Sequence, residues 1–294
     1  MITEIAPAPD RVAAEPARPG GKRRAWDEVP RWQIYVPLSL YLLFTLIPFY
    51  WILLFALRPA GSTSLVPWPM TFEHFEKVWT ERSFGTYFTN SVYVGLATLV
   101  LTTVVALAGG YALARFDFKL KRGFMLALLC SQFVPGALLL VPLFQIFANL
   151  RMINSLGSVV LAETVFQLPL SMILISGFIR NVPYSLEEAA WVDGCNRMTG
   201  FRIVVLPLLR PGLIAVGSFA FVHAWNHFLF ALMFLSDQGK QTIPVGLNTL
   251  MSADSVDLGA LAAGGIIAAV PVVIVFAFIQ KWLITGFSAG AVKG

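Results

Sequence analysis

Six long apolar segments constrain this chain more than any other feature of its sequence. Five of them contain no Asp, Glu, Lys or Arg, and the sixth contains a single acid, Glu163. A hydrocarbon layer about 30 Å thick is crossed by roughly 20 helical residues, and every backbone polar group inside it must be paired internally. The segments are therefore predicted to be six membrane-spanning helices, at residues 34–57, 91–114, 123–150, 156–179, 211–235 and 258–280.

The composition excludes the other common protein classes. Hydrophobic residues make up 57% of the chain and charged residues 13%, against roughly 25% charged in an average soluble domain. Segments of alternating polarity, which a membrane β-barrel needs, do not occur. Cys130 lies in an apolar segment and Cys195 in a polar loop, a pattern that suits neither a disulfide framework nor a metal site. We predict an all-α, polytopic membrane protein without metal or redox chemistry.

The distribution of basic residues predicts the orientation, because Lys and Arg beside the spans favour the cytoplasm. With both termini inside, 16 of the 21 Lys and Arg residues lie on the cytoplasmic side and 5 lie outside. Both termini are therefore expected in the cytoplasm, and membrane topology explains the basic balance better than nucleic-acid binding does.

The segments between the spans predict the organisation of the chain. Residues 1–31 are rich in Pro and Ala and are expected to form a disordered tail, ahead of a first helix at 32–58. A signal peptide is the alternative, but the apolar segment is too long and lacks a clear cleavage site. The external segment 59–84 contains Thr71–Thr80, which is expected either to lie at the membrane surface or to pack on the spans. A permease domain at 85–285 and a cytoplasmic end at 286–294 follow.

The cytoplasmic segment 181–210 is the most informative loop. Ser185 is followed three residues later by Glu188, which predicts a capping box and a short helix over residues 186–193. Gly194 is the expected stop, because glycine readily adopts positive φ. Ala189 and Ala190 would let a partner approach the backbone closely, and a second helix is expected over residues 196–206.

The same segment resembles the EAA signature of the membrane subunits of ABC importers. Glu188-Ala189-Ala190 is followed by Gly194 and then by Leu206-Pro207 at the family's spacing, with Val204 in place of the usual Ile. The ending from Gly286 to Gly294 and the pair Trp225-Asn226 resemble permeases of the maltose type, although His227 replaces the usual acid. The full spacing makes an ordinary amphipathic connector the less favoured interpretation.

The resemblance implies a type I ABC importer permease of the bacterial cell membrane. It further implies a second related permease subunit, two ATPase subunits and an external sugar-binding protein. The chain has no G-x-x-x-x-G-K-[ST] motif, so ATP and Mg are expected on the ATPase, with no catalytic residue or cofactor here. The residues that the resemblance assigns to ATPase coupling are Ser185, Glu187, Glu188, Ala189, Ala190, Asp193, Gly194, Leu206 and Pro207.

Polar and aromatic residues within the spans are candidates for the sugar pathway, although many such residues only hold membrane helices together. The set is Tyr93, Gln132, Glu163, Gln167, His223, Trp225 and Asn226. Glu163 should face protein or water, either accepting sugar hydrogen bonds or pairing with a donor on the second permease. The alternative function is a proton-coupled secondary transporter that uses Glu163 and the membrane histidines as a relay.

Overall fold

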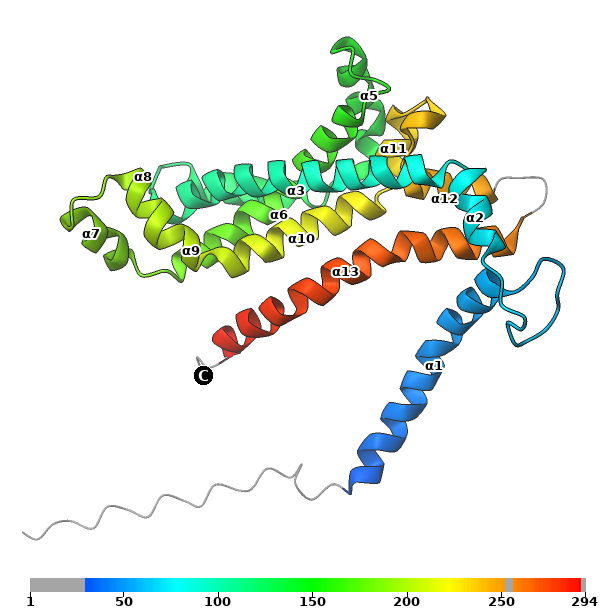
Figure 1. Ribbon diagram of the computed structural model, residues 1–294. Coiled ribbons are helices and arrows are strands. Elements are labelled where there is room, and N and C mark those ends of the chain that lie inside the picture. Colours follow the sequence, from blue (N-terminus) through cyan, green and yellow to red (C-terminus); the bar gives the residue numbers. More distant parts are fainter. Residues whose placement is uncertain (1–29, 252–255, 292–294) are drawn as a thin grey trace, which may run out of the picture. The chain divides into compact units, whose positions relative to one another are not determined.

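The computed structural model describes residues 30–251 and 256–291, with side chains up to Gln280. These residues form helices and loops, and no strand occurs among them. The chain divides into two compact units, residues 1–50 and 51–294. Helix α1 (Arg31–Leu57) begins in the first unit and ends in the second (Figure 1). Most of the tail predicted at 1–31 and the last three residues of the chain lie outside the described residues.

Among the described residues, four helices are long and apolar enough to cross a membrane. Up to six spans result if each of two bent pairs counts as one, Lys121–Ser131 with Gly136–Asn149 and Arg197–Leu208 with Arg210–Asn226. Besides α1, the four helices include α3 (Phe84–Arg115), α6 (Leu156–Arg180) and α13 (Leu258–Ala291). The all-helical prediction is confirmed. The six predicted spans agree with the upper count, and the helices of the third and the fifth are interrupted.

The third predicted span is broken near its middle. It consists of α4 (Lys121–Ser131), the 3₁₀ turn η2 (Gly136–Leu139) and α5 (Leu140–Asn149), with a bend of 97°. Pro135 lies in the break with an extended ψ of 127°. Proline has no N–H for the helical ladder and disfavours helical geometry in the residue before it, which explains the break.

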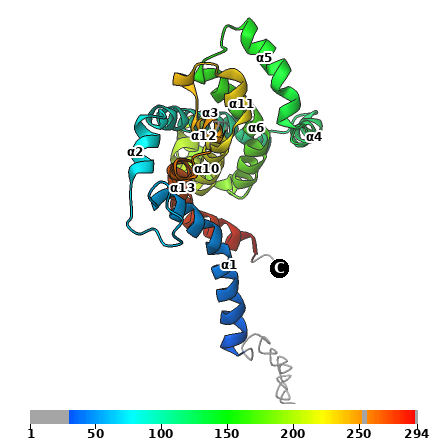
Figure 2. The same cartoon turned by 90° about the vertical axis from the view of Figure 1, so that its right-hand side faces the viewer.

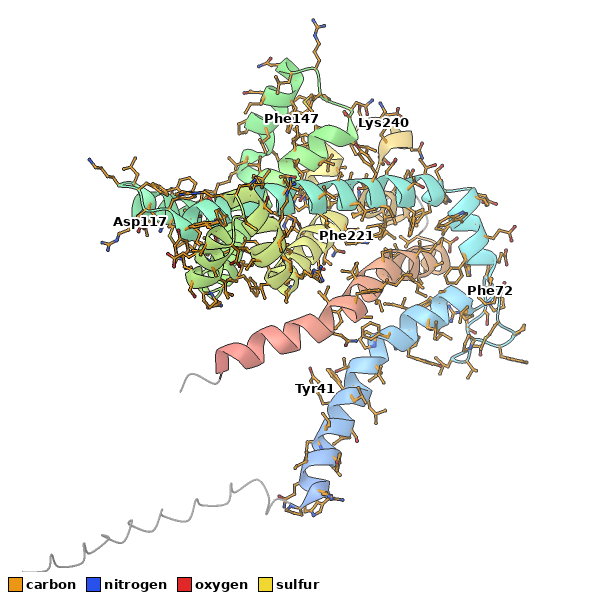
Figure 3. All side chains as sticks on the ribbon, turned by 60° about the vertical axis from the view of Figure 1, so that its left-hand side comes forward. Tyr41, Phe72, Asp117, Phe147, Phe221 and Lys240 are labelled. Atoms are coloured by element: carbon orange, nitrogen blue, oxygen red, sulfur yellow. The ribbon has the colours of Figure 1, made fainter. Side chains whose placement is uncertain are left out.

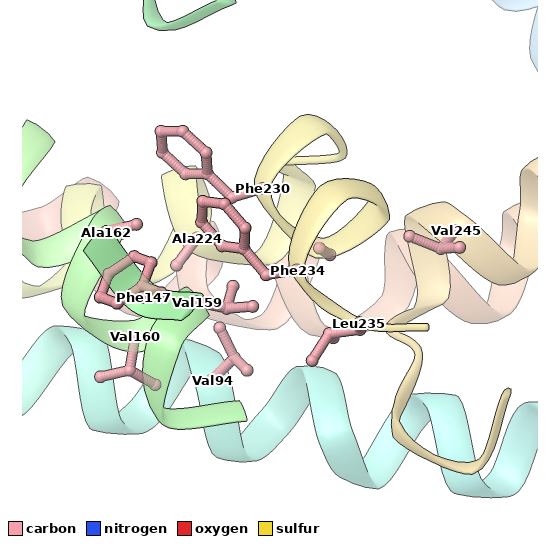
Figure 4. Packing of buried hydrophobic residues seen from close by; sticks show 11 residues of the cluster. Val94, Phe147, Val159, Val160, Ala162, Ala224, Phe230, Phe234, Leu235 and Val245 are labelled. Atoms are coloured by element: carbon pink, nitrogen blue, oxygen red, sulfur yellow. The ribbon is translucent and has the colours of Figure 1, made fainter. Parts of the chain in front are cut away.

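The fifth predicted span, residues 211–235, also divides in two. Helix α10 (Arg210–Asn226) ends where His227 turns to an extended ψ of 123°, and α11 (Leu229–Phe234) follows. Phe230 and Phe234 of α11 are fully buried against α3, α5 and α6 (Figure 4). Burying these two rings against neighbouring helices offsets the loss of a continuous helix.

Helices α3, α6 and α10 pack together and form the centre of the second unit (Figure 2). Their approach is close because small residues line the contacts, as is common between membrane helices. A Cβ at Gly110 of α3 would lie 2.7 Å from the side chain of Ile175 in α6. Helix α13 packs on α10, and its Ala268 carbonyl accepts a 3.0 Å hydrogen bond from the indole of Trp225.

Two groups of short helices lie at opposite ends of this unit (Figure 1). One end has α2 (Glu73–Thr80), η4 (Gln238–Lys240) and α12 (Ile243–Met251). The other has α7 (Tyr184–Val192), α8 (Arg197–Gly200), the π-helical turn η3 (Phe201–Val205) and α9 (Leu206–Leu208). Figure 3 labels Lys240 at the first end and Asp117 at the second. The α2 helix packs on α3 and α13, which matches the packed alternative for Thr71–Thr80.

Candidate functional site

The start of α7 differs from the prediction. The helix begins at Tyr184, after Pro183, and the amide of Leu186 donates to the Pro183 carbonyl at 3.2 Å. No side chain of a described residue caps this end, so the predicted capping box between Ser185 and Glu188 is wrong. The reason is the position of Pro183, which starts the helix earlier than expected and places Ser185 inside its first turn.

The end of α7 agrees with the prediction at Gly194. Its φ is +90°, a value that glycine adopts without the steric cost of a side chain. The amide of Gly194 donates to the Trp191 carbonyl at 3.0 Å, and the amide of Cys195 donates to the Ala190 carbonyl at 3.0 Å. This pair of bonds is the Schellman motif, which satisfies the last carbonyls of the helix and turns the chain toward α8.

Glu187 ties α7 to the end of α3. Its carboxylate accepts from Arg115 Nε at 2.7 Å and from the Tyr111 hydroxyl at 2.7 Å, and only 1% of the residue is exposed. Arg115 also donates to the Val182 carbonyl at 2.9 Å, between α6 and α7. The expectation that Glu187 is available to an ATPase is wrong, because its carboxylate is buried within this chain.

The exposed surface of α7 combines acidic residues and one small residue with large apolar side chains, among them Tyr184 and Leu186. Glu188, Ala189 and Asp193 are exposed, and Val192 is 87% exposed. Ala190 is buried against α8, near Gly200, so the expectation that both alanines are presented to a partner holds only for Ala189. Adjacent helix positions differ by about 100°, which explains why Glu187 and Ala190 face inward and Glu188 faces outward.

The segment after Gly194 is not one helix over residues 196–206, as predicted. Asn196 caps α8 by accepting from the Thr199 amide at 2.8 Å, and a π-helical turn then leads into α9. Leu206 and Pro207 of the EAA pattern lie half-buried in α9. These short elements form a compact group that packs on the end of the spans.

Glu163 forms a second cluster, with two histidines. Its carboxylate is fully buried, with Oε2 3.0 Å from His223 Nδ1 and Oε1 2.6 Å from His227 Nδ1. The first contact has hydrogen-bond geometry, whereas the second is a close approach without suitable angles. The two imidazole rings are stacked, with centroids 5.3 Å apart. Glu163 therefore finds its partners within its own chain, and they are the membrane histidines that the relay alternative had grouped with it.

The other pathway candidates are distributed over several surfaces. Gln167 lies one turn after Glu163 and donates to the Phe219 carbonyl at 3.4 Å, while Gln132 donates to the Phe166 carbonyl at 3.4 Å. Asn226 is exposed near His223 on α10, and Tyr93 is exposed on α3. Trp225 is only 2% exposed and packs among Phe88, Phe221 and α13, so the expectation that its ring faces the solute is wrong.

An ion pair connects α2 to the start of α13 at the other end of the unit. Lys77 Nζ lies 2.8 Å from Asp257 Oδ2, and His74 Nδ1 lies 3.9 Å from Oδ1. The hydrogen bond and the charge of Asp257 raise the pKa of Lys77. Burial opposes ionisation of Asp257, but hydrogen bonds from Lys77 and the Ala260 amide outweigh it and lower the pKa of that carboxyl.

Comparison with known protein families gives a match over residues 106–288 to the model for "Binding-protein-dependent transport system inner membrane component". The matched region includes α7, Glu163 and both histidines of the cluster. The secondary-transporter alternative gains no support from this family, although the structure brings Glu163 and the histidines together as that alternative required.

Several characterised relatives are similar over most of the chain. The diacetylchitobiose uptake system permease protein DasC of Streptomyces coelicolor is 34% identical, over 92% of this chain and 98% of that protein. The trehalose transport system permease protein SugB of Mycobacterium tuberculosis is 31% identical, over 85% of this chain and 93% of that protein. A solved bacterial ABC transporter involved in alginate import has a chain of the same fold. It is 19% identical, with a TM-score of 0.72 over 86% of this chain and 98% of that chain.

Proposed function

Since the chain belongs to the family of binding-protein-dependent transport system inner membrane components, we propose that it forms half of the transmembrane pathway of an ATP-driven sugar importer. Relatives named for diacetylchitobiose and trehalose support a sugar as the solute. The excess of basic residues on one side supports cytoplasmic termini. The remaining partners are a second related permease, two ATPase subunits that bind ATP and Mg, and an external binding protein.

The exposed face of α7 is the single observation on which the coupling role depends. An acid at Glu188 lies beside the small Ala189, the apolar Val192 is 87% exposed, and Gly194 turns the chain away at the end of the helix. Such a surface suits a shallow groove on an ATPase subunit, with Glu188 placed to pair with a basic residue there. We assign the contact to Glu188, Ala189, Val192, Asp193 and Gly194.

The ion pair between Glu187 and Arg115 would transmit a movement of α7 to the spans. Arg115 ends α3, and its bonds to Glu187 and to the Val182 carbonyl join α3, the end of α6 and the start of α7. A movement of α7, driven by closure of the ATPase pair, would pull on two spans at once. Access to the pathway then switches between two states of the assembly, as alternating access requires.

Reversal of one charge tests the coupling role in the complete transporter. Glu188→Arg should reduce sugar uptake per ATP hydrolysed by more than about tenfold, because loss of a paired interface charge costs roughly 2–5 kcal/mol. Glu76→Arg, at an exposed acid of α2, is the matched control and should keep the wild-type ratio. Wild-type coupling in Glu188→Arg would contradict the assignment.

The sugar itself is identified through the binding protein. Thermal shift of the binding protein encoded beside this chain, against a panel of mono-, di- and oligosaccharides, should give a stabilising shift with one class of sugar. The same sugar, radiolabelled, then serves in uptake assays. Failure of every sugar in both assays would contradict the proposed solute class.

A further inference from the structure

The cluster of Glu163, His223 and His227 presents two partly exposed imidazole rings that have no part in the coupling role. Glu163 is fully buried, yet it faces the inner edges of two imidazoles whose side chains are 40% and 23% exposed. Each ring directs Nδ1 toward the carboxylate, so its opposite edge, with Nε2, points away from Glu163. Neither Nε2 atom has a hydrogen-bond partner among the described residues.

The carboxylate fixes the way in which these rings are presented. His223 uses Nδ1 for its hydrogen bond with Glu163 Oε2, which leaves Nε2 available for a second hydrogen bond. His227 stacks on His223 and lies 4.5 Å, between ring centroids, from the fully buried Phe230. Both rings are therefore held in one orientation before any solute arrives, which lowers the entropic cost of binding.

Lipid tails cannot form hydrogen bonds with the exposed Nε2 edges of His223 and His227. An acid with two imidazoles facing hydrocarbon would cost several kcal/mol, so this face lies against water or protein. The helix also ends here, and extended backbone at membrane depth is tolerated where it is buried in protein or lines a water-filled cavity. Asn226 extends the polar surface by one turn along the exposed face of α10.

The charges at the cluster favour an uncharged solute. Residues 156–179 and 211–234, which supply the cluster and its surroundings on α6, α10 and α11, contain no Lys or Arg. Both imidazoles already face the carboxylate of Glu163, so these two segments leave no cation free to bind an acidic sugar. Sugar hydroxyls both donate and accept, and they can pair with Nε2 in either protonation state.

We propose that His223 and His227, oriented by Glu163, contact the hydroxyl groups of a neutral sugar in the transport pathway. This inference rests on the function proposed above and adds the residues and the charge class of the solute. Glu163 is a positioning residue, and the two imidazoles make the contact.

Thiol reactivity in the assembled transporter tests the site without knowledge of the sugar. In a chain with Cys130→Ser and Cys195→Ser, His223→Cys should react with polar methanethiosulfonates, whereas Ala220→Cys, fully buried on the same helix, should not. Relative to the rates with a free thiol in solution, the trimethylammonium reagent should react roughly ten- to thirtyfold faster than the sulfonate reagent, because a carboxylate about 4–6 Å away in water attracts the positive reagent and repels the negative one. Glu163→Gln should remove that preference.

A second position protects the test from a failure of His223→Cys to assemble. Asn226→Cys leaves the cluster intact and should also react with the polar reagents. In uptake assays His223→Ala should raise KM about three- to tenfold, the loss of one hydrogen bond, while Glu163→Gln should raise it less.

The outcomes separate this site from the function on which it rests. A lack of polar labelling at both 223 and 226, in a complex that takes up sugar, would overturn the site alone. Faster reaction of the sulfonate reagent would overturn the neutral-sugar assignment. An assembled wild-type complex that takes up no sugar would overturn the proposed function.

Discussion

At the scale of single residues, two adjacent glutamates have opposite environments. Glu187 is buried in an ion pair with Arg115, whereas Glu188 is exposed. Removing one partner of a buried ion pair costs about 3–5 kcal/mol, because the other charge remains without compensation. We expect Glu187→Gln to lower the thermal unfolding temperature of the purified chain and Glu188→Gln to leave it unchanged. Equal unfolding temperatures for the two variants would contradict a stabilising role for the Glu187–Arg115 ion pair.

Gly194 offers a second test at this scale. Apart from the chain neighbours of Gly194, no described residue lies within 4 Å of a Cβ built there, so substitution acts through the backbone, whose φ is +90°. Gly194→Val should reduce uptake per ATP, since a β-branched residue at positive φ costs about 1–3 kcal/mol. Gly194→Asn should retain more activity because Asn tolerates this region better. Wild-type transport per ATP by the valine variant would show that the turn is not needed.

At the scale of elements, the Lys77–Asp257 ion pair fastens α2 to the start of α13. Because the pKa of Asp257 is lowered, its contribution to stability is present above about pH 4 and is lost as the pH falls through its folded pKa. Because the pKa of Lys77 is raised, the contribution of Lys77 to stability is fully present below about pH 10.4 and is lost as the pH rises through its folded pKa. The pair is half-exposed, so it should contribute only about 0.2–1 kcal/mol.

The difference in unfolding temperature between the wild type and Asp257→Asn measures this contribution. The difference should be constant from about pH 6 to pH 9 and should shrink below about pH 4. Asp117→Asn, in the exposed pair with Lys121, is the comparison variant and should have a smaller effect throughout. A difference in unfolding temperature that grows as the pH falls would contradict the lowered pKa of Asp257.

At the scale of the whole molecule, the orientation in the membrane is the main prediction. Asp254, which the sequence places in an outer loop, lies outside the described residues, so Glu76 of α2 replaces it as the outer reporter. In a Cys130→Ser background, an impermeant thiol reagent applied to intact cells should label Glu76→Cys and spare the native Cys195. Helix α2, which contains Glu76, and helices α7 and α8, between which Cys195 lies in the chain, are at opposite ends of the unit formed by residues 51–294 (Figure 1). Labelling of Cys195 from outside would show that the topology is the reverse of the predicted one.

The sequence by itself determined the helical class, the membrane environment and the stop at Gly194. Apolar length and the conformational freedom of glycine are local properties, so they can be read along the chain. The EAA spacing also predicted the family, because a fixed pattern of residues is preserved in the sequence itself.

Only the tertiary structure decided which polar residues meet. Glu187 and Arg115 are 72 residues apart, and Glu163 and His223 are 60 apart, so their pairing depends on how α3, α6, α7 and α10 pack. Packing also placed Trp225 in the core and divided the fifth span, where two buried Phe rings of α11 outweigh a continuous helix. Apolarity identifies a segment that can enter the membrane, but the contacts between helices decide where it bends and which side chains remain exposed.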